Sequence, residues 1–252
     1  MHYYLVGCYM VCFKMKQSFS VCIPTFNRRY VVTHAVESAL VNEPLEVIIY
    51  DDASSDLTWK HFIKPAKNVR YVKGLKNLGV NGARNKLVSL AMGDFLIFLD
   101  SDNLLFNNAL DYIKRQPLGL VNLFGTVDKG LRKLSWNRGG KFHYTFKEWI
   151  KGEVAGGEFL MVIHKSVFLV EPFDETLDCF EAFWLNKVIK RFGVQVFNAP
   201  VQLYSFDEKN KESKRLLMPK NWPRRIKEYL RYYKEFGKYY NKKDLCIKAI
   251  KT

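Results

Sequence analysis

The sequence predicts an α/β fold in which a mostly parallel central sheet carries helices on both of its faces. Short apolar runs, rich in valine and isoleucine, alternate along the first hundred residues with segments whose apolar residues recur every three or four positions. Strands that alternate with helices in this way are typical of parallel sheets. Conspicuously polar stretches follow three of the apolar runs, where ligands bind in such sheets.

The first hundred residues supply four expected strands and three expected helices. The strands are 18–24, 45–51, 68–73 and 94–100, each a short and largely apolar run. The helices are 28–42, 54–63 and 79–92. The second of these helices opens with the capping residues Ser54 and Ser55, and we expect Gly93 to end the third.

The second half of the chain has a less regular pattern. We expect a strand pair at 118–128 and 130–137, a buried strand within 156–168, a helix at 180–193 that Gly193 ends, and a strand at 194–200. Because no linker interrupts these elements, we expect one domain at 18–206. A leader, 1–17, precedes it, and a basic helical extension, 207–252, follows.

Composition limits the classes of binding partner and the cellular compartment that fit this protein. The net charge of +15 indicates an anionic partner, such as nucleic acid, an anionic membrane or a phosphorylated substrate. The five cysteines have irregular spacing without a CxxC pair, which argues against a zinc site and fits a reducing, cytoplasmic compartment. The apolar start of the leader is too short to span a bilayer.

Two carboxylates, Asp100 and Asp102, stand one residue apart at the end of the strand expected at 94–100. Repulsion and desolvation would oppose two adjacent negative charges there unless something compensated them. A hard divalent cation, Mn²⁺ or Mg²⁺, prefers oxygen ligands and can bridge them to substrate phosphates. The alternative is a polar turn that caps the next helix.

Polar residues also close the first two strands. The stretch PTFN, 24–27, has groups that could reach a nucleobase or a ribose. The stretch DDASSD, 51–56, includes a helix cap, which explains its serines but leaves Asp51 and Asp52 unexplained. Arg84, in the helix expected at 79–92, is either a solvated side chain or the counter-charge of a diphosphate at this edge.

Four stretches in this order resemble the family 2 glycosyltransferases, which have the Rossmann-like GT-A fold: SVCIPTFNR, VIIYDDASSD, NLGVNGARN and DFLIFLDSDN. They cover residues 18 to 103. A weaker match follows in GGEFLMVIHKSVFLVEPFDETLDCFEAFWL. The resemblance implies that 18–103 binds a nucleotide-sugar, 104–206 binds the acceptor, and transfer inverts the anomeric centre.

The resemblance also implies donor-site roles for individual residues. The nucleoside pocket would be lined by Pro24, Thr25 and Asn27, with Asn77 from the third stretch and either Asp51 or Asp52 against the base. Arg84 would face the diphosphate. Asp100 would lie near the ribose and the metal, and Asp102 would bind the metal, Mn²⁺ or Mg²⁺.

The expected catalytic base is the point at which this sequence departs from the family. The family's acidic pair falls on Glu181 and Ala182, so an alanine stands where the aspartate usually taken as the base would be. Glu181 is therefore our first candidate for the base and Asp178 the second. The departure keeps open a relative that binds nucleotide-sugar but is catalytically weak.

The extension from residue 207 contains fifteen basic and six acidic residues, more than half of the chain's excess charge. Aromatic and aliphatic residues recur at helical spacing within 221–240, between lysines and arginines. Such a helix suits the surface of an anionic membrane. Alternatively its apolar stripe packs back on the domain and its lysines are solvated.

The sequence therefore predicts a metal-dependent glycosyltransferase that uses a nucleotide-sugar, most simply a UDP-sugar. The acceptor would be a glycan or a lipid-linked saccharide, and the enzyme would be peripheral at the inner face of the cell membrane. A basic nucleic-acid-binding protein is the alternative from another class. No nucleic-acid module is recognisable, and acids cluster at the sheet edge, so we expect no nucleic acid as partner. Trp184 is a candidate for stacking on a sugar ring.

Overall fold

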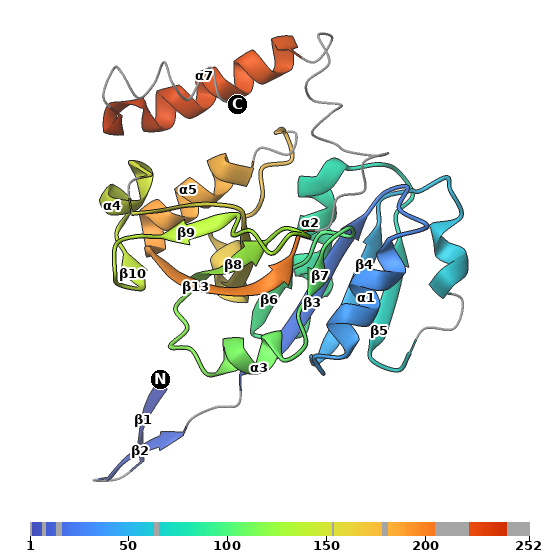
Figure 1. Ribbon diagram of the computed structural model, residues 1–252, viewed down its shortest axis with the longest axis horizontal. Coiled ribbons are helices and arrows are strands. Elements are labelled where there is room, and N and C mark those ends of the chain that lie inside the picture. The colour runs from blue at the N-terminus through green and yellow to red at the C-terminus, as the bar shows by residue number, and fades with distance from the viewer. Residues whose placement is uncertain are drawn as a thin grey trace.

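The structure is a computed structural model (Figure 1) and describes residues 2–6, 9–13, 17–62, 66–152, 154–177, 181–204 and 222–240. Its central sheet has the order β10 (His143–Tyr144), β13 (Val194–Leu203), β8 (Val121–Val127), β12 (Phe159–His164), β6 (Phe95–Phe98), β3 (Phe19–Thr25), β4 (Glu46–Asp51) and β5 (Val69–Lys73). A short strand, β7 (Leu104–Leu105), pairs with β13.

The sheet is mostly parallel. Strands β6, β3, β4 and β5 run parallel to one another, and β13 runs parallel to β8. Strand β12 is antiparallel to both β6 and β8, so it starts at the edge where those two strands end. This reversal brings the residues that precede β12 to the carboxyl ends of the parallel strands.

Helices cover both faces of the sheet (Figure 1). On β3, Val21 and Ile23 pack in one core with α1 (Val32–Leu40) and α3 (Ala109–Lys114). The side chain of Cys22 points the other way, into a core shared with α2 (Gly79–Leu90) and α5 (Glu181–Phe192). Alternate residues of one strand thus serve opposite layers. The predicted α/β class, with helices on both faces, is confirmed.

Two local predictions are wrong. The segment expected as the helix 54–63 forms only a short 3₁₀ helix, η1 (Thr58–Phe62), after Leu57 takes a positive φ of 66°. Gly93 does not end α2, which stops at Leu90 with Ala91 already extended. The glycine is needed for close packing instead, because a Cβ there would lie 2.6 Å from the backbone nitrogen of Ser20.

The expected pair at 118–128 and 130–137 is only an isolated bridge, between Val127 and Lys133. Strand β8 is a central strand of the sheet, and β9 (Ser135–Asn137) pairs instead with β11 (Ala155–Gly157). Gly193 does follow α5 with a φ of +71°, and its N–H donates to Ile189 O at 2.8 Å. That predicted helix end is confirmed.

The chain outside the central domain is described in part. Residues 2–6 and 9–13, in the predicted leader, form an antiparallel hairpin, β1 (His2–Val6) and β2 (Tyr9–Phe13), which the sequence analysis did not anticipate. The extension contains α7 (Trp222–Phe236), which ends in a 3₁₀ turn, η4 (Gly237–Tyr239). Two other parts of the extension, 207–221 and 241–252, lie outside the described residues.

Trp184 is a core residue and does not reach a sugar site. Its side chain is 1% exposed, stacks on Phe173 at 4.1 Å between ring centroids, and donates from Nε1 to Glu171 O at 2.9 Å. We expect Trp184→Ala to lower the free energy of unfolding by about 3–5 kcal/mol in chemical denaturation. Trp59→Ala, at a half-exposed position on η1, should cost far less. Equal losses would contradict the core assignment.

Candidate active site

The candidate site lies at the edge of the sheet where β3, β4 and β6 end, called the rim below. Thr25 and Asp51 are the last residues of β3 and β4 and are paired in register, and Asp100 follows β6 by two residues. All three parallel strands run to the same edge, which is why polar residues separated by many positions in the sequence meet there.

The two rim loops that follow β3 and β4 are hydrogen-bonded to each other. Asn27, in the left-handed region with φ 53°, donates from its backbone N–H to Ser54 Oγ at 2.8 Å. Its side-chain Oδ1 accepts from the N–H of Ser55 at 2.9 Å. Pro24 is buried in β3, and Thr25 Oγ1 is buried without a hydrogen-bond partner among the described residues. The predicted nucleoside residues of both loops therefore form one rigid border.

Asp51 and Asp52 are both buried, and their carboxylates bind the chain's own groups. Asp51 accepts from the Ser54 N–H at 2.8 Å and from the Tyr71 hydroxyl. Asp52 accepts from the N–H groups of Leu78 and Gly79, both at 2.8 Å, at the start of α2. Burial raises the pKa of Asp52, and these two backbone donors oppose the rise.

Asp52 thus anchors α2 as well as bordering the rim. Asn77 belongs to the same junction, since its Nδ2 donates to Asp52 O at 3.2 Å. An aspartate at a helix start satisfies backbone N–H groups that lack a partner within the helix. The position of α2, and of Arg84 on it, therefore depends on the second rim loop.

Arg84 joins the end of β6 to the start of α5. Its side chain is 2% exposed, and its guanidinium binds Asp100 Oδ1 at 3.2 Å and the carboxylate of Glu181. Asp100 follows β6, and Glu181 is the first residue of α5, nearly a hundred positions from Arg84 in the chain. Three of the residues predicted from the sequence are thus brought into direct contact.

Asp102, the second carboxylate of the predicted metal pair, is paired with an arginine. Asp102 Oδ2 lies 3.7 Å from Arg28, a residue of the first rim loop that the sequence analysis did not single out. The side chains of Asp100 and Asp102 are 47% and 24% exposed, so both carboxylates reach the surface of the rim.

The Glu181 side chain is 41% exposed, and opposing influences act on its carboxyl. The protein around the carboxyl raises its pKa, the neighbouring Arg84 lowers it, and the negative charge of Asp100 raises it again. The raised pKa is favourable for a proton acceptor near neutral pH, as long as Arg84 keeps the carboxyl ionised. The second predicted base, Asp178, lies outside the described residues.

The segment that leads toward Glu181 is held against α2. Asn81 donates from Nδ2 to the backbone oxygens of Asp174 and Leu177, at 2.9 and 3.1 Å. One turn later, Asn85 donates to Phe173 O at 2.9 Å and accepts from the Phe173 N–H at 3.0 Å. These amide contacts fix residues 173–177 relative to Arg84.

Glu158 lies close to the site, although no sequence pattern predicted it as a site residue. Glu158 stands just before β12, at the edge where the parallel strands end, and its N–H donates to Leu134 O at 3.0 Å. Gly157 has φ +101°, and a Cβ there would lie 2.0 Å from that same oxygen, so only glycine fits. The glycine pair before Glu158 is the sequence signal that could have identified it.

Glu158 shares the electrostatic environment of the rim. Its side chain reaches solvent, yet the protein around its carboxyl raises the pKa, and the charges of Glu181 and Asp100 raise it further. Burial and the carboxylates of the site, first among them Glu158, raise the pKa of Tyr204 to about 12. Tyr204 directly follows β13. Residues next to β6, β12 and β13 and the first residue of α5 therefore share one electrostatic environment.

The charges at the rim fit a divalent cation that is bound together with a substrate. Three carboxylates, those of Asp100, Asp102 and Glu181, pair with two arginines, and the negative charges of Asp100 and Glu181 also act on a fourth, that of Glu158. Among the described residues no three histidine, cysteine or acidic side chains are grouped closely enough to hold a metal ion by themselves. Mg²⁺ and Mn²⁺ need no such cage when one or two carboxylates and substrate phosphates complete their shell.

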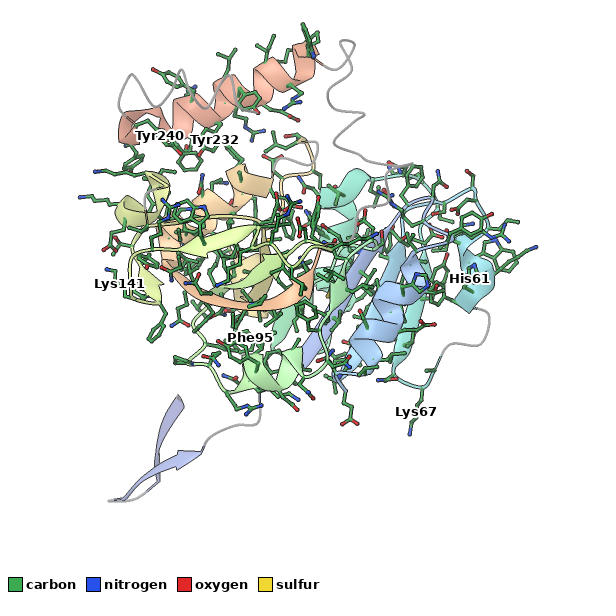
Figure 2. The ribbon with its side chains drawn as sticks, viewed as in Figure 1. His61, Lys67, Phe95, Lys141, Tyr232 and Tyr240 are labelled. Carbon is green, nitrogen blue, oxygen red and sulfur yellow. The ribbon has the colours of Figure 1, made fainter. Side chains whose placement is uncertain are left out.

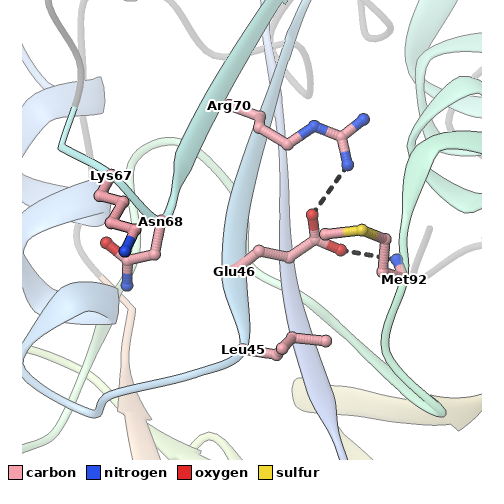
Figure 3. Close-up of a pocket in the computed structure, with 6 residues that line it drawn as sticks. All are labelled: Leu45, Glu46, Lys67, Asn68, Arg70 and Met92. Carbon is pink, nitrogen blue, oxygen red and sulfur yellow. Dashed lines mark hydrogen bonds and ion pairs between the residues drawn. The ribbon is translucent and has the colours of Figure 1, made fainter.

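A hollow of about 460 Å³ lies at the other edge of the sheet, away from these carboxylates (Figure 3). Glu46, the first residue of β4, lines it and binds Arg70 at 2.9 Å and the Met92 N–H at 2.6 Å. Glu46 also accepts from Ser20 Oγ at 2.7 Å. Its carboxylate is thus occupied in joining β3, β4 and β5 to the end of α2.

Known glycosyltransferases are similar in sequence to parts of this chain. A glucosyltransferase of Campylobacter jejuni, GalNAc(5)-diNAcBac-PP-undecaprenol beta-1,3-glucosyltransferase, is 30% identical over 188 residues, which are 66% of this chain and 58% of the relative. The Escherichia coli enzyme WfaP, UDP-Glc:alpha-D-GlcNAc-diphosphoundecaprenol beta-1,3-glucosyltransferase, is 38% identical over 88 residues, which are 33% of this chain and 35% of that enzyme.

The fold is also that of a solved structure. TarS from S. aureus, in complex with UDP-GlcNAc, superposes with a TM-score of 0.63 at 19% identity, over 78% of this chain and 60% of that one. The chain spans little more than half of the Campylobacter relative's length. The profile described as Glycosyl transferase family 2 matches residues 20–152, more than half of this chain. The chain belongs to the family 2 glycosyltransferases.

Proposed function

We propose that this protein transfers a sugar from a nucleotide-sugar, most simply a UDP-sugar, to a glycan or lipid-linked saccharide, with inversion and with the help of Mn²⁺ or Mg²⁺. The observation that carries the proposal is the contact of Arg84 with both Asp100 and Glu181. It joins a donor-side carboxylate to the candidate base. The names of the Campylobacter and E. coli relatives, both glucosyltransferases with diphosphoundecaprenol-linked acceptors, support the acceptor class.

The nucleoside would lie against the two fastened rim loops. Pro24, Thr25 and Asn27 would border it on one side, and the loop that begins at Asp51 and Asp52 on the other, with Asn77 beside it. The buried hydroxyl of Thr25, which has no partner among the described residues, is a candidate for binding the nucleotide. This arrangement would hold the donor before the acceptor arrives.

Asp100 and Asp102 would hold the divalent cation, which would stabilise the negative charge that develops on the leaving diphosphate. Arg84 and Arg28, both in contact with this carboxylate pair, would add positive charge on the protein side. Because both arginines are already positioned, little reorganisation would be required during the reaction.

Glu181 would act as the base of a single displacement. The acceptor hydroxyl would give its proton to the Glu181 carboxylate while its oxygen forms the new bond to the anomeric carbon. The bond from that carbon to the diphosphate would break at the same time, which inverts the configuration. Asp178 remains the second candidate for this role.

Glu158 is a further candidate for the acceptor side, and it could compensate for the alanine at position 182. It faces Glu181 from another element. We expect Glu158→Gln to lower kcat/KM for the acceptor by about 10- to 100-fold, because a hydrogen bond to a charged group would be weakened. UDP binding should be unchanged. Glu37→Gln, on the exposed surface of α1, is the matched control. Full activity of Glu158→Gln would remove this residue from the site.

The place of action follows from the proposed acceptor. We propose that the protein works in the cytoplasm as a peripheral protein at the inner face of the cell membrane, without a nucleic-acid partner. Within the described ranges, no helix has both the length and the apolar character needed to cross a bilayer.

A donor panel tests the proposed function. The intact chain would be titrated with UDP-, GDP- and dTDP-sugars, with and without Mn²⁺, and followed by thermal shift and by nucleotide release in the presence of a diphospholipid-linked saccharide. We expect a metal-dependent shift with a UDP-sugar. If no nucleotide-sugar produces a shift, the proposed donor class is wrong; if a shift occurs without transfer, the catalytically weak relative is favoured.

A further inference from the structure

Helix α7 has apolar residues on two different faces: one face packs against the domain, and the other is largely exposed. On the inner face, Phe236 is fully buried against α4 (Phe146–Ile150) and α5. On the outer face, four large apolar residues are 55–61% exposed: Trp222, Ile226, Leu230 and Tyr233. The tail therefore packs back on the domain and presents a second apolar surface as well.

The four exposed residues form one continuous stripe, called the outer stripe below. They are separated by four, four and three positions, a spacing that places side chains on one side of an α-helix. The helix has fifteen residues and is thus about 22 Å long. An apolar ridge of this length, exposed on a separate helix, is unfavourable in water and indicates a binding surface.

Specific contacts hold α7 in the orientation that keeps this stripe outside. Tyr232 Oη accepts a hydrogen bond from Asn186 Nδ2 of α5 at 2.7 Å and lies 2.6 Å from Tyr240 Oη. Figure 2 shows Tyr232 and Tyr240 between α7 and the rest of the molecule. Glu235 binds Lys190 of α5 at 2.7 Å.

The acidic and the basic side chains of α7 lie on different sides of the helix. Both of its acidic residues are turned inward, since Glu228 is 8% exposed and Glu235 is paired with Lys190. Exposed lysines flank the outer stripe, at positions 227 and 234 of the helix and at 238 in η4. The described outward surface of α7 is therefore apolar and positive, which complements a layer of anionic headgroups.

α7 also contacts the segment that precedes Glu181 in the chain. Arg231, in its middle, binds Asp174 Oδ2 at 2.6 Å and Thr176 Oγ1 at 2.9 Å. These residues belong to the segment that Asn81 of α2 holds, one turn before Arg84. A surface that receives the outer stripe would thus approach the acceptor half of the rim.

We propose that the outer stripe is a membrane-docking face whose partner is an anionic phospholipid bilayer. The four apolar side chains enter the boundary between headgroups and acyl chains, and the flanking lysines bind the lipid phosphates. The proposal rests on the proposed function for its purpose, bringing the enzyme to a lipid-linked acceptor, but its evidence comes from α7 itself.

Flotation of the intact protein with vesicles tests the proposal. Vesicles of phosphatidylcholine with phosphatidylglycerol should carry the wild type, and vesicles of phosphatidylcholine alone should carry much less. The variant Trp222→Ser, Ile226→Ser, Leu230→Ser should lose at least tenfold in binding even at low salt. The control variant Val41→Ser, Met92→Ser, Leu169→Ser removes apolar residues elsewhere that are at least as exposed, and it should bind as the wild type does.

A second measurement covers the case in which the triple variant disturbs α7. Fluorescence of the wild type should be quenched by vesicles of lipids brominated in their acyl chains, and Trp222→Phe, which keeps an aromatic ring, should remove most of this quenching. Substitution of Lys227, Lys234 and Lys238 by glutamine should weaken binding to anionic vesicles only.

The outcomes separate this proposal from the proposed function. Absence of binding to anionic vesicles, or equal losses in the triple variant and its control, would overturn docking through the outer stripe, and UDP binding would be unaffected by that result. Vesicle binding without any nucleotide-sugar binding would instead leave docking intact and overturn the proposed function.

Discussion

Replacing Glu181 with glutamine should lower the rate of sugar transfer by about 10²- to 10⁴-fold while leaving UDP-sugar binding within a few-fold of the wild type. Glutamine has nearly the same shape and can still accept a hydrogen bond from Arg84, but it cannot take the acceptor's proton. Single-turnover rates and calorimetric titration of UDP, measured on the same samples, would separate the chemical step from binding.

Two comparisons make this result specific. Glu37→Gln, on the exposed side of α1, should transfer sugar at the wild-type rate. Turnover by Glu181→Gln within a few-fold of the wild type would exclude Glu181 as the base. The role would then pass to Glu158, which faces the same cluster, or to Asp178.

The pH dependence should carry the signature of the same group. The pKa of Glu181 is raised, with burial as the largest cause. A base must be ionised to act, so activity should be present above the raised pKa and be lost as the pH falls through it. The acid limb should therefore lie above the value of about 4.3 that is usual for glutamate. Glu181→Gln should lack this limb in its residual rate.

Asp102→Asn should raise the dissociation constant of UDP in the presence of Mn²⁺ by about 100-fold or more. Residues that only hydrogen-bond to a metal ligand contribute about 10- to 100-fold to metal affinity. Loss of a metal ligand itself should therefore cost about 100-fold or more. Arg28 would lose its ionic partner at 3.7 Å, but the rim loops are held by other bonds, so the fold should persist.

Asp111→Asn is the matched control for this variant, because Asp111 is an exposed aspartate on α3 that also has a basic partner, Lys114 at 3.6 Å. Its UDP affinity and its response to Mn²⁺ should equal those of the wild type. If Asp102→Asn kept the full metal-dependent gain in thermal stability, Asp102 would not be a metal ligand.

The sheet of the donor half could be predicted because each strand carries its own signal. Strands β3, β4, β5 and β6 lie within two residues of the expected limits, since buried parallel strands are short apolar runs with abrupt ends. The helix expected at 54–63 failed where the backbone at Leu57 turns left-handed, which periodicity does not report. The pairing expected between 118–128 and 130–137 is wrong because β9 pairs with β11, which follows α4 in the chain.

The rim residues that follow β6 and the arginine on α2 could be predicted, whereas Glu158 could not. Asp100, Asp102 and Arg84 belong to contiguous motifs, and the structure brings Arg84 and Asp100 into contact, with Asp102 two residues further on. Glu158 reaches the rim only because β12 runs against its neighbours, a reversal that no local pattern encodes. The inward orientation of Asp52 likewise depends on where α2 begins.

The proposed function depends on a rim that binds a nucleoside diphosphate together with a divalent cation held by Asp100 and Asp102. Calorimetric titration of UDP into the intact protein, with Mn²⁺ and then with chelator, measures this binding. We predict one UDP site per chain whose affinity falls by at least tenfold on removal of the metal. Equal affinity for UDP with and without Mn²⁺, or no binding in either case, would exclude this mode of donor binding.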